Sequence, residues 1–520
     1  MVKKIISNKI FTVILFYFTL LILVSALCFN DPNIDVDFWS RLIMGHHVFH
    51  SGSVMKQDII SYAPTHVWYD HEWLLSYFLF VFVKYFGVAG IFFIKILFSF
   101  LTIVFIDLIS VKKSGCFEYK YKYFYITLLV ALMFHTKVFT TLRCQNFSQM
   151  ILPVMILILE TYRNNPKTKI IYLIPFLFLV WLNCHGGCMY GMGILGLYIF
   201  GQILNRKEST KLFVIFIISM FAFIINPWGI DFIKFMISAI SVDRSYIAEW
   251  QSPFTMSAEV LIPFILIQLT ILSVFIYSSI RQKLNFRTLD YVKILVFSAV
   301  FLIGLKYIKY AISYFMVVFM FLYDDFKTVC DDIVNLFKKI IKDSVPSIKY
   351  CVLLFYIVIS TMLFVTNDYD LCYKNTIKEL PLYPLQMLID NNIKGNIFMS
   401  FFTSGYTAYK FYPDFKIYMD GRQEQVYDFS VVQKEMAFLG NPMKYAYAFL
   451  NEYKPDIILV ENFFPVKYFL DTKQDYYKKV YQDNMFAMYL APSKQLAEYK
   501  YPQRVPEFSQ RNFIKSKCFN

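Results

Sequence analysis

Charged residues are scarce in this chain of 520 residues: they make up only 17% of it, whereas hydrophobic residues make up 58% and aromatic residues 20%. A soluble enzyme has about a quarter of its residues charged and distributes its apolar residues in amphipathic patterns. Here the apolar residues form long runs, and about 20 helical residues are enough to cross a hydrocarbon layer of about 30 Å. The composition therefore excludes an ordinary soluble enzyme and predicts an α-helical polytopic membrane protein.

Several common signatures are missing too. The nine cysteines are scattered, most of them within apolar segments, and they form no disulfide framework. Residues 184–188 (CHGGC) have the spacing of neither a zinc module nor a haem attachment site. The G-x-G-x-x-G pattern at 191–196 follows no strand and lies within an apolar run. It therefore predicts close helix packing rather than a dinucleotide site.

About eleven apolar runs are candidate membrane spans, several of them only when tilted or extended at their ends. They are residues 10–29, 88–110, 123–138, 147–162, 170–183, 187–204, 211–226, 259–280, 289–304, 306–323 and 350–366. The first run is too long for a cleaved secretion signal, and Leu27 rather than a small residue precedes Cys28, so we expect an uncleaved span. Residues 73–86 are separated from the next run by Gly87 and Gly90, and we expect them to form a helix in the outer interface of the membrane.

The charges of the loops predict the orientation. One set of loops is basic and the alternate set begins with the acidic residues 30–72. The basic set contains Lys112, Lys113, Lys120, Lys122, Arg163, Lys167, Lys169, Arg206, Lys207, Lys211, Arg281, Lys283 and Arg287. By the positive-inside rule this set is cytoplasmic. We therefore expect a multi-pass protein of the plasma (inner) membrane with its N-terminus in the cytoplasm. The net charge of +14 is then a topology signal, and nucleic acid is not an expected partner.

Beyond residue 366 the apolar runs shorten to the length of strands. Predicted strands cover 397–401, 416–419, 456–460 and 485–490, with helical patterns between the earlier ones. We expect two domains: a transmembrane domain over residues 1–366, with an acidic outer loop at 30–87, and a soluble extracytoplasmic α/β domain over 367–520.

Polar residues of the membrane domain fall at one predicted face, the outer one. Ionisable groups near a bilayer are costly and usually serve function. The group comprises Asp35, Asp37, Asp58, His71, Glu72, Arg143, Gln145, Asn183, His185, Asn226, Glu249, Gln251, Lys306 and Lys309. Each alone could snorkel or cap a helix, but so many segments predict a cavity open to the outer leaflet. Such a cavity suits a polyprenyl-phosphate sugar: a carboxylate deprotonates the acceptor hydroxyl, and Arg143, Lys306 or Lys309 binds the donor phosphate.

These residues also carry a resemblance. The segment from Asp37-Phe38-Trp39-Ser40-Arg41 to Ser51-Gly52 resembles the first outer loop of the GT-C membrane glycosyltransferases, which include protein O-mannosyltransferases and bacterial aminoarabinose transferases. His71-Glu72-Trp73-Leu74 occupies the place of their (Lys/His)-Pro-Pro-Leu segment. The chain is most similar to a bacterial branch of that superfamily. The motifs of that branch are Asp35-Val36-Asp37-Phe38-Trp39, His71-Glu72-Trp73, Arg143-x-Gln145, Trp181-x-Asn183-x-His185-Gly186-Gly187, Asn226-Pro227-Trp228-Gly229, Glu249-Trp250-Gln251-Ser252-Pro253 and Asp420-Gly421-Arg422.

The resemblance implies a GT-C-like glycosyltransferase with Asp37 as catalytic aspartate. The chain departs from the family where Phe38 replaces the second acid of an Asp-Glu pair, which leaves Asp35 as its possible partner. Asp35 and Asp37 are also the residues that would hold a divalent metal, if one is used. The expected partners are membrane lipids, a polyprenyl-phosphate-sugar donor and a glycan, lipid or protein acceptor. The alternatives are a transporter or flippase of lipid-linked glycans and a non-catalytic scaffold of envelope assembly.

Overall fold

The computed structural model of the chain describes residues 9–30, 35–114, 125–131, 133, 141–241, 244, 247–284, 288–340 and 380–501. Two compact units make up the chain, and each is described here by itself. The helical unit comprises Met1–Asn30, Phe93–Thr140 and Gln145–Asp368. The mixed unit comprises Asp31–Phe92, Thr141–Cys144 and Tyr369–Asn520, so the acidic loop packs with the C-terminal part of the chain.

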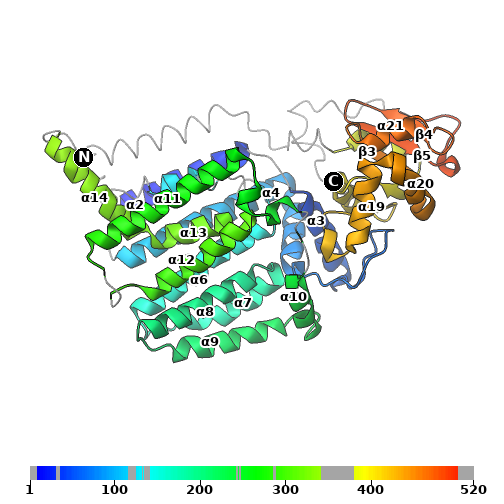
Figure 1. Cartoon of the computed structure of the whole chain (residues 1–520). Coiled ribbons are helices and arrows are strands. Elements are labelled where there is room, and N and C mark those ends of the chain that lie inside the picture. Colours follow the sequence, from blue (N-terminus) through cyan, green and yellow to red (C-terminus); the bar gives the residue numbers. More distant parts are fainter. Residues whose placement is uncertain are drawn as a thin grey trace. The chain divides into compact units, whose positions relative to one another are not determined.

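The helical unit contains most of the apolar helices (Figure 1). They are α2 (Lys9–Asn30), the second part of α4 (Trp73–Ser114), α6 (Gln145–Asn164), α7 (Leu173–Cys184), α8 (Cys188–Leu204), α9 (Thr210–Met220), α10 (Asp231–Ser241), α11 (Ala258–Arg281), α12 (Tyr291–Lys306), α13 (Ala311–Phe321) and α14 (Tyr323–Ile340). Short 3-10 turns flank them at Ile170–Tyr172, Phe221–Phe223, Ala248–Trp250, Pro253–Thr255 and Ile308–Tyr310.

Each predicted span that the structure describes overlaps a helix, although residues 224–226, 307 and 322 are not helical. The run 123–138 is helical at residues 125–131 and 133 and is otherwise outside the described residues, as is the whole of 350–366. Among the described helices, Ala89–Ser110 and Ala258–Arg281 are long and apolar enough to cross a membrane. The number of eleven spans stays a prediction.

Gly87 interrupts α4, with φ 55° and ψ −138°, a conformation that only glycine adopts at low cost. The helix therefore divides into residues 73–86 and a long apolar second part. The sequence predicted this break. The three glycines of the 191–196 pattern have different surroundings. A Cβ on Gly191 would lie 2.4 Å from the Trp181 ring, whereas a Cβ on Gly193 or Gly196 would meet no atom within 4 Å. Close packing is confirmed for Gly191 alone.

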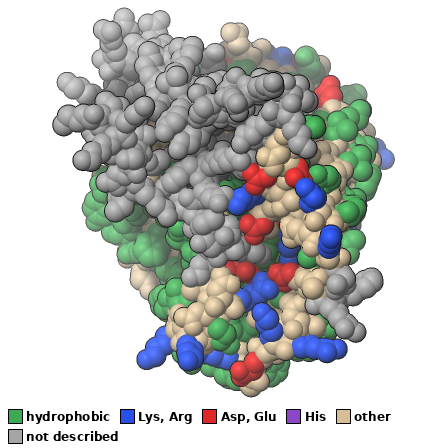
Figure 2. Space-filling model, turned by 90° about the vertical axis from the view of Figure 1, so that its left-hand side faces the viewer, with side chains coloured by type: hydrophobic (Ala, Val, Ile, Leu, Met, Phe, Trp, Pro, Cys, Tyr) green, Lys and Arg blue, Asp and Glu red, His purple; other side chains and the backbone are tan. Residues whose placement is uncertain are grey.

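The basic loops converge at one end of the helical unit. Arg163 forms an ion pair of 2.8 Å with Asp290, Lys211 donates to the carbonyl of Thr168, and Asn205 accepts from the amide of Tyr291. Figure 2 looks onto the side of the molecule where α14 lies, and there Lys and Arg side chains gather with Asp and Glu side chains among hydrophobic ones. Three of the basic loops that the sequence assigns to one face thus lie together, and most of the loop at 112–122 is outside the described residues.

The mixed unit is built on a five-stranded sheet of order β2-β1-β3-β5-β4. Its strands are β1 (Gly395–Phe398), β2 (Phe415–Ile417), β3 (Ile457–Glu461), β4 (Lys478–Gln482) and β5 (Phe486–Leu490). β1 pairs in parallel with β2 and β3, and β5 is antiparallel to β3 and β4. The four predicted strands are present with shifted ends. β4, which begins with two lysines and buries only its central Val480, was not predicted.

The remaining helices of the mixed unit are α3 (Val36–Ser51), the first part of α4, α17 (Leu382–Asp390), α18 (Phe401–Phe411), α19 (Phe429–Gly440), α20 (Pro442–Tyr453) and α21 (Pro465–Asp471), with 3-10 turns at Gln423–Gln425 and Pro492–Lys494. α3 packs against α18, where the rings of Trp39 and Tyr406 meet edge to face at 5.0 Å. The acidic loop also extends the sheet, because the amide of Tyr62 donates to the carbonyl of Ile417 at 2.9 Å. The acidic loop is thus attached to the edge of the sheet at β2.

Candidate functional site

The acidic site begins at the N-terminus of α3. Asp35 is the N-cap: one carboxylate oxygen accepts the amide of Asp37 at 3.0 Å. The other oxygen accepts the Nε of Arg143 at 2.5 Å. Asp35 is buried, so the guanidinium compensates a charge that water does not reach. Both oxygens of this carboxylate are therefore engaged by structural partners.

Asp37 lies in the first turn of α3 and is only half-buried. Among the described residues, no side chain or amide forms a hydrogen bond or ion pair with its carboxylate. The pKa of Asp37 is raised well above the ordinary value, first by burial and then by the charge of Asp35, against the lowering effects of Arg143 and Arg41. This carboxylate thus holds a proton more tightly than an exposed one and has no structural partner there.

Arg41 lies one turn further along α3 and is buried. Its Nη1 contacts Asp70 at 2.7 Å and Glu72 at 3.1 Å. Burial lowers the pKa of Arg41, but the carboxylates of Glu72 and Asp70 raise it by more, so the pKa lies above its ordinary value. Glu72, predicted to bind substrate, is thus engaged with a buried arginine, and the Nε2 of His71 lies 3.8 Å from Glu72.

The motif Asp420-Gly421-Arg422 follows β2 and joins this loop from the other end of the sequence. Asp420 accepts the hydroxyl of Ser40 at 3.0 Å and the Nε of Arg422 at 2.8 Å. Arg422 also forms an ion pair of 2.7 Å with Asp58, and both side chains are completely buried. The Trp68 ring lies 4.9 Å from the guanidinium of Arg422 and 5.8 Å from that of Arg41.

The lysines of the helical unit are part of a second cluster. Lys309 Nζ contacts Glu249 at 2.7 Å and lies 4.7 Å from the centre of the Trp250 ring. The carbonyl of Gln251 accepts the amide of Ile308 at 2.9 Å, which joins the two segments. Lys306 lies over the Tyr307 ring at 5.0 Å and has no carboxylate partner among the described residues.

His185 ends α7 and is held by its Nδ1. The amide of Gly187 donates to this atom at 3.0 Å, so Nδ1 is an acceptor, and the hydroxyl of Ser148, 2.6 Å away, donates to it as well. Ser148 in turn accepts the indole N–H of Trp181 at 2.6 Å. The imidazole is therefore the neutral tautomer with its proton on Nε2.

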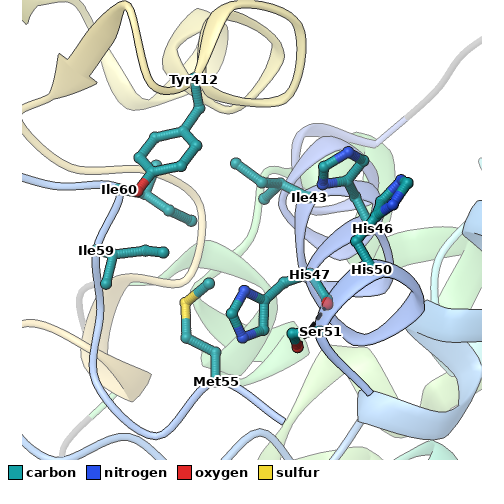
Figure 3. Close-up of a pocket in the computed structure, with 9 residues that line it drawn as sticks. All are labelled: Ile43, His46, His47, His50, Ser51, Met55, Ile59, Ile60 and Tyr412. Atoms are coloured by element: carbon teal, nitrogen blue, oxygen red, sulfur yellow. Dashed lines mark hydrogen bonds between the residues drawn. The ribbon is translucent and has the colours of Figure 1, made fainter. Parts of the chain in front are cut away.

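A pocket of about 260 Å³ lies at the other end of α3 (Figure 3). Figure 3 shows His46 and His50 next to each other, with their ring centres 4.4 Å apart, and His47 turned toward Met55. Isoleucines and Tyr412 complete the wall. Ten residues of helix, about 15 Å, separate His47 from Asp37, so this pocket is distinct from the acidic site.

The fold is shared with solved membrane enzymes. The chain superimposes on ArnT from Cupriavidus metallidurans bound to undecaprenyl phosphate with a TM-score of 0.55 and 10% identity, over 93% of this chain and 98% of that one. It also superimposes on the archaeal oligosaccharyltransferase AglB from Archaeoglobus fulgidus, in complex with an inhibitory peptide and a dolichol-phosphate, with a TM-score of 0.55 and 11% identity. That alignment covers 94% of this chain and 74% of AglB. This is the GT-C fold.

The GT-C resemblance predicted from the acidic loop is thus confirmed for the fold. No protein-family model matches the sequence, and no curated protein sequence matches it. The activity of this GT-C chain therefore rests on its own residues.

The GT-C fold divides the predicted site residues between its two units. Asp35, Asp37, His71, Glu72 and Arg143 belong to the mixed unit, whereas His185, Glu249, Gln251, Lys306 and Lys309 belong to the helical unit. Arg41, Asp58 and Asp70 were not predicted as partners within the site. A signal was available for Arg41 alone, because its i,i+4 spacing from Asp37 places both on one side of α3.

Among the described residues, no group of three or more His, Cys, Asp or Glu side chains could hold a metal ion. Asp35 is engaged with Arg143 and with the amide of Asp37, so a metal at this position would have to compete with both.

Proposed function

We propose that this protein is a membrane glycosyltransferase that moves a sugar from a polyprenyl-phosphate-linked donor to a hydroxyl group of an envelope glycan, lipid or protein. The observation that carries this proposal is the contrast between Asp35 and Asp37. Asp35 is committed to a helix cap and an ion pair. Asp37, two residues on, is half-buried, has a raised pKa and has no structural partner among the described residues.

The proposed reaction is a single displacement. The acceptor oxygen attacks the anomeric carbon and forms the new glycosidic bond, while the bond from that carbon to the phosphate oxygen breaks. The phosphate leaves with the electron pair, and Asp37 takes the proton of the acceptor hydroxyl. Attack opposite the leaving phosphate inverts the anomeric configuration. The phosphate needs no protonation, because it is already a good leaving group.

The other residues support this step in different ways. Arg143 and Arg41 both lower the pKa of Asp37, against the larger raising effects of burial and Asp35, so we propose that they favour the ionised carboxylate that acts as the base. We propose that Lys306 or Lys309 binds the donor phosphate, with Glu249 and Gln251 holding the segment that carries them. We also propose that His71, Glu72 and His185 bind the substrates. Glu72 is already paired with Arg41, and His185 is hydrogen-bonded to Ser148, so we expect smaller contributions from these two.

The proposed orientation places the basic end of the helical unit in the cytoplasm and the acidic site outside, with the protein in the plasma (inner) membrane. Reporter fusions after Arg163 and Arg206 then give a cytoplasmic signal, and one after Asn367 gives an external signal. A cytoplasmic signal from the fusion at Asn367 would contradict both the orientation and the mechanism.

Asp37→Asn tests the proposed function. Asn cannot accept the proton, so we expect a rate loss of about 10²–10⁴ with normal folding. Asp35→Asn is the matched control: Asn caps a helix about as well as Asp, so this variant should retain more of the rate. Transfer is measured with full-length protein in nanodiscs, using polyprenyl-phosphate sugars extracted from host membranes, by mass spectrometry.

A purified Asp37→Asn protein that transfers sugar at the parental rate would refute the mechanism and favour a flippase of lipid-linked glycans. Mass spectrometry of envelope glycans from a deletion strain identifies the sugar and acceptor. An unchanged set of glycans there would favour the scaffold.

A further inference from the structure

Gly421 lies directly against the proposed base. A Cβ built on this residue would be 2.5 Å from Oδ1 of Asp37, 3.5 Å from Cγ2 of Val36 and 3.7 Å from the Cα of Asp37. Real Cβ atoms essentially never approach another atom to 2.5 Å, so an alanine would displace the carboxylate or the turn. The backbone at Gly421 does not have the positive φ that favours glycine. The glycine is therefore explained by the closeness of Asp37.

The neighbours of Gly421 fix its position from both sides. Asp420 accepts the hydroxyl of Ser40, which lies one turn after Asp37 on α3. Arg422 is held by both oxygens of Asp420 and by Asp58. Burial of these charged groups makes any displacement costly, because each would lose its partner away from water. The turn therefore cannot move aside easily.

We infer that Gly421 is a positioning residue: the absence of a side chain at this position leaves the Asp37 carboxylate free to take the orientation used for proton transfer. This inference rests on the proposed function. It gives the C-terminal part of the chain a role in placing the base, a role different from holding the acceptor. A turn that only closes β2 would need Asp420 and Arg422, but it would not need a glycine against Asp37.

The test compares Gly421→Ala with Gly440→Ala in the full-length protein. Gly440 ends α19, and a Cβ there meets nothing within 4 Å. We expect Gly421→Ala to lower kcat by on the order of 10²-fold, as a misplacement of about 1 Å does, with an unchanged KM for the donor. The pH at which the rate rises to half its maximum should also shift. Binding of undecaprenyl phosphate alone should stay as in the parent, and Gly440→Ala should match the parent in all readouts.

The double variant Asp37→Asn/Gly421→Ala separates a positioning role from a structural one. If Gly421 acts through Asp37, the alanine costs no further rate once the base is gone. A further loss of the same size in the double variant would overturn the inference, and so would a parental kcat in Gly421→Ala. These results leave the proposed function standing as long as Asp37→Asn alone is slow.

A folding defect is recognised separately. Ser40→Ala removes the hydrogen bond to Asp420 without placing an atom against Asp37. If both variants melt at lower temperature but only Gly421→Ala changes kcat and the pH profile, the positioning role holds. If the two variants lose rate in proportion to their loss of stability, Gly421 is structural and the inference fails.

Discussion

Two ion pairs, one in each unit, differ in how deeply they are buried. In the mixed unit, Arg422 lies completely buried between Asp420 and Asp58, which come from distant parts of the chain. In the helical unit, the pair of Lys309 and Glu249 is partly exposed, with 21% and 33% of the two side chains accessible. Buried networks fix a geometry because breaking them is costly, whereas exposed pairs can exchange partners. The two pairs therefore differ in how firmly they hold a geometry.

The largest expected difference between the two pairs is in the stability lost when each pair is broken. Arg422→Ala leaves Asp420 and Asp58 buried without a cation, which should lower the free energy of unfolding by about 3–5 kcal/mol. Lys309→Ala breaks a partly exposed pair and should cost at most about 1 kcal/mol. Hydrogen exchange of the β1 and β3 amides in Arg422→Ala, and of the α12 and α13 amides in Lys309→Ala, measures the two costs in the full-length protein. Equal exchange in the two variants would show that burial does not set the cost.

Binding of the proposed donor should depend on the lysines of the helical unit. A charge-assisted hydrogen bond contributes about 1.5–3 kcal/mol, so loss of the lysine that contacts the phosphate should weaken binding of undecaprenyl phosphate by about ten- to a hundred-fold. We expect Lys306→Ala to have the larger effect, because Lys309 and Arg143 already face carboxylates. Isothermal titration calorimetry of undecaprenyl phosphate with protein in nanodiscs measures this affinity. Unchanged affinity in the alanine variants of Lys306, Lys309 and Arg143 would contradict the assignment of the phosphate site.

The smallest expected effect is a dependence of stability on pH. Burial raises the pKa of Glu435 from 4.5 to about 8, and the charge of Glu461 adds to this rise. The folded state therefore keeps a proton that the unfolded state has lost above pH about 4.5, so stability falls as pH rises toward 8. Between pH 7 and 9 the loss amounts to about 1.4 kcal/mol.

Glu435→Gln should remove this slope, because the amide keeps an oxygen that can accept the amide of Phe401 but does not titrate. Hydrogen exchange of the mixed unit at the two pH values is the measurement. Lys434→Gln, at an exposed neighbour, is the control. A slope that persists in Glu435→Gln would assign the pH dependence to another group.

Local patterns predicted the helices and the short strands, because hydrophobic period and glycine breaks are properties of neighbouring residues. The break at Gly87 and the cap at Asp35 are of this kind. The sequence also predicted Asp37 as the catalytic base and Lys306 or Lys309 as a ligand of the donor phosphate. It could not indicate that Arg143 pairs with Asp35 or that Arg422 reaches Asp58, because these partners are far apart along the chain. β4 was missed because it begins with two lysines and only its central residue, Val480, is buried.

The hydrogen bond between Ser40 and Asp420 joins residues 380 positions apart in the chain. At a synthesis rate of 5–20 residues per second, the ribosome needs about 20 to 75 s to reach Asp420 after Ser40 has been made. During that interval the acidic loop has neither the strand β2 that it extends nor the arginine that neutralises Asp58. A nascent chain therefore lacks these partners of the acidic loop until about four fifths of it has been translated, and a chain that terminates earlier lacks the turn beside Asp37.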